Sequence, residues 1–210
     1  MKKSLLGFLA LCLLLPLLAN ASPNQTPQPV SASEDKTPPS YDMKAQAFFD
    51  LQDLHKKMVA LATAIPAEKY AWRPEAGTRS ISELFLHVSA ANHNIMGLMA
   101  STTPEPAYRA DGFETSTTDK AKIVEQLNQS FAYAEAGVAA MTNADFARPE
   151  KKLGPEANSG DVIYILVTHN HEHFGQSIAY ARMNGVTPPW TLEAQKKAAA
   201  AKEAKPQKQD

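Results

Sequence analysis

Cysteine is nearly absent from this sequence: Cys12 is the only one among 210 residues, and it lies within an apolar run near the N-terminus. If that run is removed on export, the remaining chain has no disulfide, no thiol nucleophile and no sulfur ligand. A metal ion would then have to be bound by histidine, carboxylate or water. The sequence also lacks a glycine-rich phosphate-binding loop and an excess of positive charge, because its formal net charge is −1. We therefore expect no nucleic-acid partner.

Two segments precede the predicted domain. Residues 1–21 begin with Lys2 and Lys3, continue through an apolar run and end in a small-x-small tripeptide, which is the pattern of a cleaved signal peptide. The alternative is a retained N-terminal anchor, for which the apolar run is short. Residues 22–40 are rich in proline, serine and small polar residues, which predicts a disordered tether. We expect an exported, periplasmic or secreted protein with no stable membrane anchor after cleavage.

The predicted domain, residues 41–190, contains four amphipathic stretches and no alternating strand pattern. Helices are expected over residues 43–64, 81–99, 119–141 and 159–183, with Ser80, Thr118-Asp119 and Ser159 as caps. Glu83 follows Ser80 at the spacing of a capping box. The second connection is long and is expected to cover one end of a site. Together these features favour an all-α four-helix bundle. Residues 191–210, rich in alanine and lysine, have no apolar stripe and are expected to form a fraying tail.

Three of the six histidines lie in the fourth predicted helix. His169 and His173 are four residues apart, so both imidazoles leave the same face of a helix and can bind one metal ion. His171 is about 200° round from His169 and points away. The best third ligand is His87 in the second helix, beside its apolar stripe. The alternative for His87 is a hydrogen-bonded core histidine.

Other polar residues are candidates for lesser roles, each with a plainer alternative. Glu83, one turn before His87, is expected to orient that imidazole, unless it only caps the helix. Glu172 is a weak candidate for a catalytic base, with a solvated ion pair as the alternative. Gln176 is expected to support the site by a hydrogen bond, unless it is a plain surface residue. We expect the two remaining histidines, His55 and His93, at the surface.

Two motifs in the chain resemble those of the DinB-like proteins. The first consists of Trp72-Arg73-Pro74, Gly77, residues 80–84 and His87, and the second of residues 169–176, Tyr180, Gly185 and Pro188-Pro189. The resemblance covers about residues 43–190. It implies a four-helix bundle with up-down-down-up connections and a divalent metal held by His87, His169 and His173. The family and its relatives include thiol-dependent transferases and isomerases. The chain departs from the usual member at Phe174, where a basic residue is common, and in its export signal.

These observations favour an exported protein that binds a divalent metal ion, either zinc, nickel, iron or manganese, through three histidines. On this hypothesis it is a metal-dependent hydrolase or group transferase acting on a small molecule. The first alternative is a non-catalytic metal-binding or ligand-binding bundle. The second is a helical interaction domain whose histidines are merely packed. A homodimer is compatible with all three.

Overall fold

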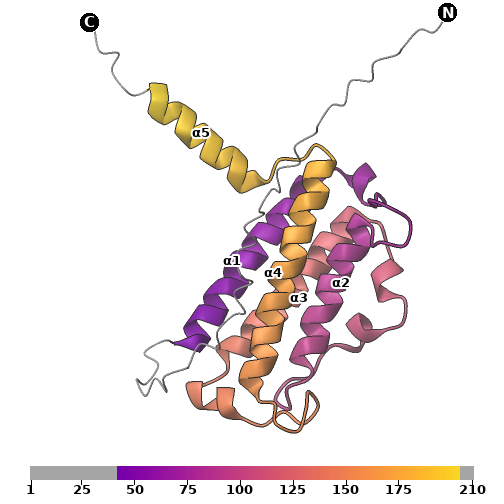
Figure 1. Ribbon diagram of the computed structural model, residues 1–210. Coiled ribbons are helices and arrows are strands. Elements are labelled where there is room, and N and C mark those ends of the chain that lie inside the picture. Colours follow the sequence, from indigo (N-terminus) through magenta and orange to yellow (C-terminus); the bar gives the residue numbers. More distant parts are fainter. Residues whose placement is uncertain (1–41, 204–210) are drawn as a thin grey trace, which may run out of the picture. The chain divides into compact units, whose positions relative to one another are not determined.

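The computed structural model of the chain describes residues 42–203, so the predicted signal peptide and tether lie outside the described residues. Within this range all regular structure is helical, apart from one isolated antiparallel bridge between Pro149 and Asn158. The long helices are α1 (Met43–Ala64), α2 (Ile81–Met96), α3 (Lys120–Ala139), α4 (Ser159–Met183) and α5 (Pro189–Glu203) (Figure 1). Short 3-10 helices occupy the connections, namely η1 (Ala67–Lys69), η2 (Pro106–Arg109), η3 (Phe113–Thr115) and η4 (Asn143–Ala147). The prediction of an all-α fold is confirmed.

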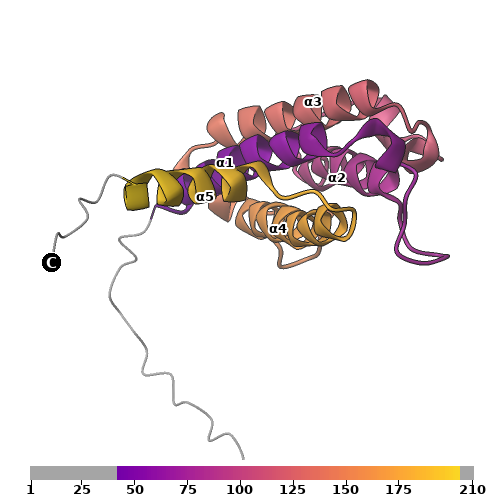
Figure 2. The same cartoon turned by 90° about the horizontal axis from the view of Figure 1, so that it is seen from above.

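Helices α1 and α2 each pack against both α3 and α4, and the two views show these four helices side by side (Figures 1 and 2). Hydrogen bonds between helix ends fix some of the directions. Lys44, at the start of α1, donates to the carbonyl of Ala139 at the end of α3 over 2.9 Å. Lys120, at the start of α3, donates to the carbonyl of Ile65 just beyond α1 over 2.8 Å. Helices α1 and α3 are therefore antiparallel.

The buried carboxylate of Glu150 places the start of α4 beside the end of α2. Glu150 is only 2% exposed, and it accepts hydrogen bonds from the backbone N–H of Ala100 at 2.9 Å and from the hydroxyl of Ser159 at 2.7 Å. Arg148 supplies the compensating positive charge, because its Nε lies 3.3 Å from Oε1 of Glu150. A buried charge is tolerated only when it is paired and hydrogen-bonded in this way. Glu150 thus links the chain just after α2, the start of α4 and the segment that contains Arg148 at one end of the bundle.

The apolar stripes of the four helices meet in two clusters of buried side chains, one toward each end of the bundle. One cluster includes Leu61, Tyr70, Phe85, Phe131 and Tyr180. The other includes Leu51, Met96, Val138 and Leu166. Each fully buried side chain of this size contributes about 1.5–3 kcal/mol relative to an exposed one. Burial of these stripes holds α2 against α4.

The helix starts follow the local sequence closely. The Ser80 hydroxyl accepts from the Glu83 N–H, and the Glu83 carboxylate accepts from the Ser80 N–H, so the predicted capping box is present. Asp119 caps α3, as expected. The prediction for α4 is wrong by one residue, because Asn158 is the cap and forms a capping box with Asp161, whereas Ser159 is the first helical residue. Asparagine has the same ability to accept from the first free N–H groups.

The connection between α2 and α3 is folded against the bundle. Both η2 and η3 pack against α2. Between them Gly112 adopts a φ of 76°, a left-handed conformation that favours glycine. The predicted second helix is too long, since α2 ends at Met96 and the chain turns at Gly97. The connection therefore covers the outer face of α2, and it carries Glu114 to that helix.

The predicted tail contains helix α5, which has no buried residue. Helix α4 ends at Met183, and Gly185 follows with a φ of 76°, as the sequence predicts for a helix stop. Pro189 then begins α5, because the first helical position needs no N–H donor. None of the described helices is both long enough and apolar enough to span a membrane.

Candidate metal site

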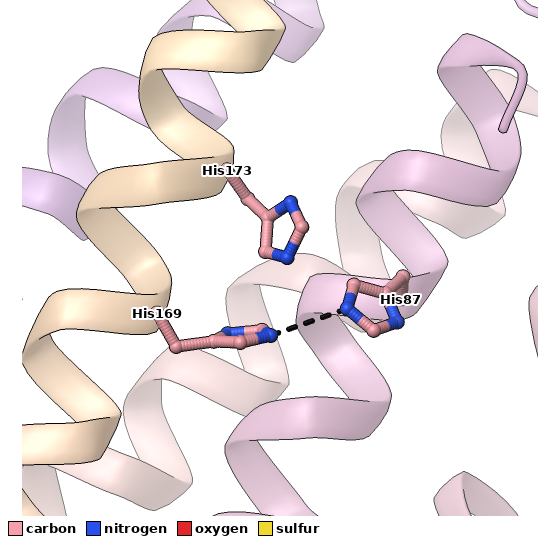
Figure 3. A group of neighbouring side chains, drawn as sticks. All are labelled: His87, His169 and His173. Carbon is pink, nitrogen blue, oxygen red and sulfur yellow. Dashed lines mark hydrogen bonds between the residues drawn. The ribbon is translucent and has the colours of Figure 1, made fainter. Parts of the chain in front are cut away.

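Three histidines from two helices converge between α2 and α4 (Figure 3). His87 comes from α2, and His169 and His173 come from α4. The Nε2 atoms of His87 and His169 lie 3.1 Å apart, and one nitrogen from each of the three rings lies within 4.8 Å of the others. Nitrogens that bind one tetrahedral zinc ion lie about 3.3 Å apart. The three nitrogens therefore lie close enough together to bind a single ion.

The helical period explains which histidines meet. His169 and His173 are one turn apart and face α2, whereas His171 lies between them in sequence and is exposed. His173 is 8% exposed and His87 is partly buried, so the site lies at the edge of the bundle interior. The geometry brings together the three histidines that the sequence predicts as ligands.

Two of the three rings are held through their other nitrogen. His87 Nδ1 lies 2.7 Å from a carboxylate oxygen of Glu114, and His173 Nδ1 lies 2.9 Å from the amide oxygen of Gln176. The Gln176 amide group in turn donates to the Tyr180 hydroxyl over 3.0 Å, which fixes its orientation. Each acceptor favours a proton on the Nδ1 that it faces, which leaves a lone pair on Nε2. Lone pairs at Nε2 are what a metal ion requires.

Burial favours the neutral form of His87 and His169. Burial, together with the neighbouring His173 and His87, lowers the pKa of His169 to about 4. Burial also lowers the pKa of His87, although the hydrogen bond to Glu114 opposes this effect. Among the described residues, His169 Nδ1 is buried without a hydrogen-bond partner. Neutral, closely spaced imidazoles form a donor set that fits a divalent transition metal.

The prediction that Glu83 orients His87 is wrong. The two oxygens of Glu83 accept from the Ser80 N–H at 3.0 Å and from the Arg73 guanidinium at 2.7 Å. The capping box holds this carboxylate at the start of the helix, one turn away from the imidazole. Glu114 makes the contact with His87 instead, although it lies in a connection with no local pattern. The sequence feature that pointed toward this contact was the length of the connection, from which we expect it to cover one end of a site.

Arg79 completes the contacts of Glu114. Its Nε lies 2.7 Å from the second carboxylate oxygen, and its Nη2 lies 3.4 Å from the oxygen that faces His87. Burial alone would raise the pKa of Glu114, but hydrogen bonds from Arg79 and His87 outweigh it and hold that pKa below its usual value. Glu114 is therefore ionised near neutral pH and bridges the two side chains.

The remaining predicted site residues have mixed outcomes. Gln176 contacts the site directly, through His173. Glu172 is exposed, and within residues 42–203 no hydrogen bond joins it to the three histidines. His55 is partly buried and pairs with Glu135 at 2.7 Å, on the side of the bundle formed by α1 and α3.

The prediction that His93 lies at the surface is wrong, since it is 1% exposed. Its ring lies between Tyr108, at a centroid distance of 3.9 Å, and Tyr133, at 4.2 Å, and is nearly parallel to both. Tyr108 belongs to η2, so the folded connection covers a face of α2 that would otherwise meet solvent. His93 follows His87 by six residues and so leaves α2 in a different direction. It does not join the cluster of His87, His169 and His173, as the sequence predicts.

Comparison with known proteins agrees with this fold. The sequence profile of the DinB superfamily matches residues 50–177, a span that includes all three histidines. The crystal structure of a DinB-like protein from Bacillus cereus ATCC 10987 is similar, with a TM-score of 0.53 and 13% sequence identity over 70% of this chain and 93% of that chain. At this identity the likeness shows the fold alone. No curated protein matches the chain. Because the profile match spans more than half of the sequence, the chain belongs to the DinB superfamily.

Proposed function

We propose that this chain binds one divalent metal ion, either zinc, nickel, iron or manganese, through His87, His169 and His173. The observation that carries the proposal is the approach of three imidazoles whose nitrogens lie within 4.8 Å of one another. Without an ion, such an arrangement places imidazole nitrogens directly against each other, with Nε2 of His87 only 3.1 Å from Nε2 of His169. Imidazole nitrogens suit zinc, nickel and iron, and manganese less well.

The protein groups around the site have distinct roles in this proposal. Burial favours the neutral form of His87 and His169, so one nitrogen of each ring keeps a lone pair near pH 7. Gln176 holds the ring of His173 through Nδ1. Three protein ligands leave positions open to water or substrate, which is the pattern of catalytic sites rather than of structural ones. A bound ion would supply a Lewis acid able to make a water or thiol nucleophilic near neutral pH.

On this basis we propose a hydrolase or group transferase that acts on a small molecule. One observation favours the alternative of a non-catalytic metal-binding bundle. Glu172, the candidate base, is exposed, and the carboxylate that does contact a histidine, Glu114, is already paired with Arg79. Proton transfer would therefore fall to water or to the substrate itself.

Elemental analysis of the purified chain tests metal binding. The protein is loaded separately with zinc, nickel, iron or manganese and dialysed, and retained metal is measured together with the thermal midpoint. We expect one ion per chain and a higher midpoint for the preferred metal. If none of the four is retained and none stabilises the fold, the proposal is wrong. His171→Ala is the matched control, because His171 lies in the same helix turn but is exposed.

We further propose that the chain is exported, as the pattern of residues 1–21 predicts. N-terminal sequencing of the protein recovered from cell fractions tests this directly. Export predicts a mature chain that begins at Ser22 in a fraction outside the cytoplasm. An intact N-terminus in the cytoplasmic fraction would contradict it.

A further inference from the structure

Glu114 is the carboxylate that contacts the three-histidine cluster within the described part of the chain. It lies in η3, and its Oε1 is 2.7 Å from Nδ1 of His87, 27 residues earlier in the sequence. The contact crosses from the connection to α2, so it depends on how the connection folds. A carboxylate with a single partner could turn away, but Glu114 contacts both His87 and Arg79.

Arg79 provides the second contact from the opposite side. Its Nε binds Oε2 of Glu114 at 2.7 Å, which leaves Oε1 directed at the imidazole. Arg79 immediately precedes Ser80, whose capping box fixes the start of α2. The guanidinium, from the residue just before the N-cap of α2, and the imidazole, from within α2, therefore hold the carboxylate between them. Charge-assisted hydrogen bonds of this length are about twice as strong as neutral ones.

We propose that Glu114 is a positioning residue for His87: it holds the proton of the ring at Nδ1 and so presents the Nε2 lone pair to the metal ion. The connection of residues 97–119 thereby becomes part of the metal site. This inference rests on the proposed metal binding, but its central claim about the ring is testable without metal.

The physical reason is the choice between two neutral forms of imidazole. A neutral ring carries one proton, on Nδ1 or on Nε2, and the hydrogen bond made by one nitrogen decides which form prevails. The carboxylate is an acceptor only, so it selects the form with the proton on Nδ1. The unprotonated Nε2 of His87 then faces Nε2 of His169 at 3.1 Å.

The chain contains a second histidine–carboxylate pair that serves as a matched control. Glu135 contacts Nδ1 of His55 at the same distance, 2.7 Å. His55 has the same side-chain exposure as His87, 20%. That pair lies between α1 and α3 and has no part in the cluster. Removing its carboxylate reports the effect of losing such a pair away from the metal site.

The first experiment is nitrogen NMR of the His87 ring in the metal-free full chain, at about pH 7.5 where imidazoles are neutral. The variants are Glu114→Ala, Glu114→Met and Glu114→Gln. The first two remove the acceptor, and methionine keeps the side-chain length in case alanine prevents folding. We expect the wild type and Glu114→Gln to carry the proton on Nδ1. Glu114→Ala and Glu114→Met should shift it toward Nε2. An unchanged proton position in both would overturn the inference.

The second experiment measures metal affinity by competition with a chelator, using the ion that the wild type retains. Loss of a partner that orients a ligand typically weakens affinity about 10–100-fold. We expect this loss for Glu114→Ala or Glu114→Met, recovery of most of it in Glu114→Gln, and wild-type affinity for Glu135→Ala. Equal losses in Glu114→Ala and Glu135→Ala would make the effect a general loss of stability and overturn the inference. A wild type that retains no metal would refute the proposed function, while the NMR result would still decide the role of Glu114.

Discussion

Asn170 donates a hydrogen bond to the side-chain oxygen of Asn92 over 2.8 Å, and this bond joins α4 to α2 directly beside His169. Both side chains are fully buried. Asn92 continues the link by donating to the hydroxyl of Ser130 on α3 at 3.2 Å. A one-residue slip of α4 would turn His169 by about 100° and break the pair. We infer that the two asparagines fix the register at which the histidines meet.

The asparagine pair gives a prediction about stability. Asn170→Ala should lower the free energy of unfolding by about 1–3 kcal/mol, because it leaves the buried oxygen of Asn92 without a donor. The double variant Asn92→Ala/Asn170→Ala should cost less than the sum of the single variants, since no such orphan remains. Urea denaturation followed by circular dichroism measures all three. Strict additivity would show that the pair does not act as a unit.

The second prediction concerns the ligands themselves. His169→Ala and His173→Ala should each abolish stoichiometric metal binding while the helical circular dichroism of the bundle persists. His171→Ala should retain the metal content of the wild type, because that ring is exposed. Elemental analysis of the dialysed variants provides the measurement. A loss for His171→Ala as large as that for His173→Ala would refute the assignment of faces on α4.

Metal affinity should decrease as the solution becomes acidic. Free imidazole has a pKa near 6.5, and burial holds the pKa of His87 below that value and the pKa of His169 at about 4. Protons therefore do not compete for these two nitrogens above about pH 6.5. We expect affinity to fall only on the acidic side of that value. Chelator competition at a series of pH values tests this, and an affinity that stays constant down to about pH 4 would contradict imidazole ligation.

His93 gives a prediction about stability and pH that is independent of the metal. Burial lowers its pKa, so between that value and about 6.5 the unfolded chain binds a proton that the folded chain does not. The contribution of His93 to the free energy of unfolding is therefore fully present above about pH 6.5 and is lost as the pH falls below that value. His93→Phe keeps a ring between Tyr108 and Tyr133 but cannot take up a proton.

Metal-free His93→Phe should therefore lose less stability than the metal-free wild type between about pH 7.5 and pH 5. Urea midpoints of both proteins across this range supply the comparison, and the other titrating groups cancel in the difference. The variant also removes the buried Nε2, which has no partner among residues 42–203. Parallel pH curves would show that His93 does not titrate on unfolding in this range.

Local sequence accounted for the helices and for the pairing of ligands on one of them. The capping box of Ser80 and Glu83 depends on residues three apart, and the shared face of His169 and His173 depends on residues four apart. Such relationships follow from the helical repeat alone. The error at the start of α4 was of the same local kind, since two neighbouring residues, Asn158 and Ser159, can both act as caps.

Four amphipathic helices, the common face of two histidines and the outward direction of His171 could all be predicted from the residues, because each follows from the period of an α-helix. The contact of Glu114 rather than Glu83 with His87, and the cover of Tyr108 over His93, became visible only in the folded chain. Both contacts come from the connection between α2 and α3, whose path is set by packing against α2 and not by a local repeat. Interactions between residues far apart in sequence depend on how the helices and their connections pack, and no local spacing specifies that.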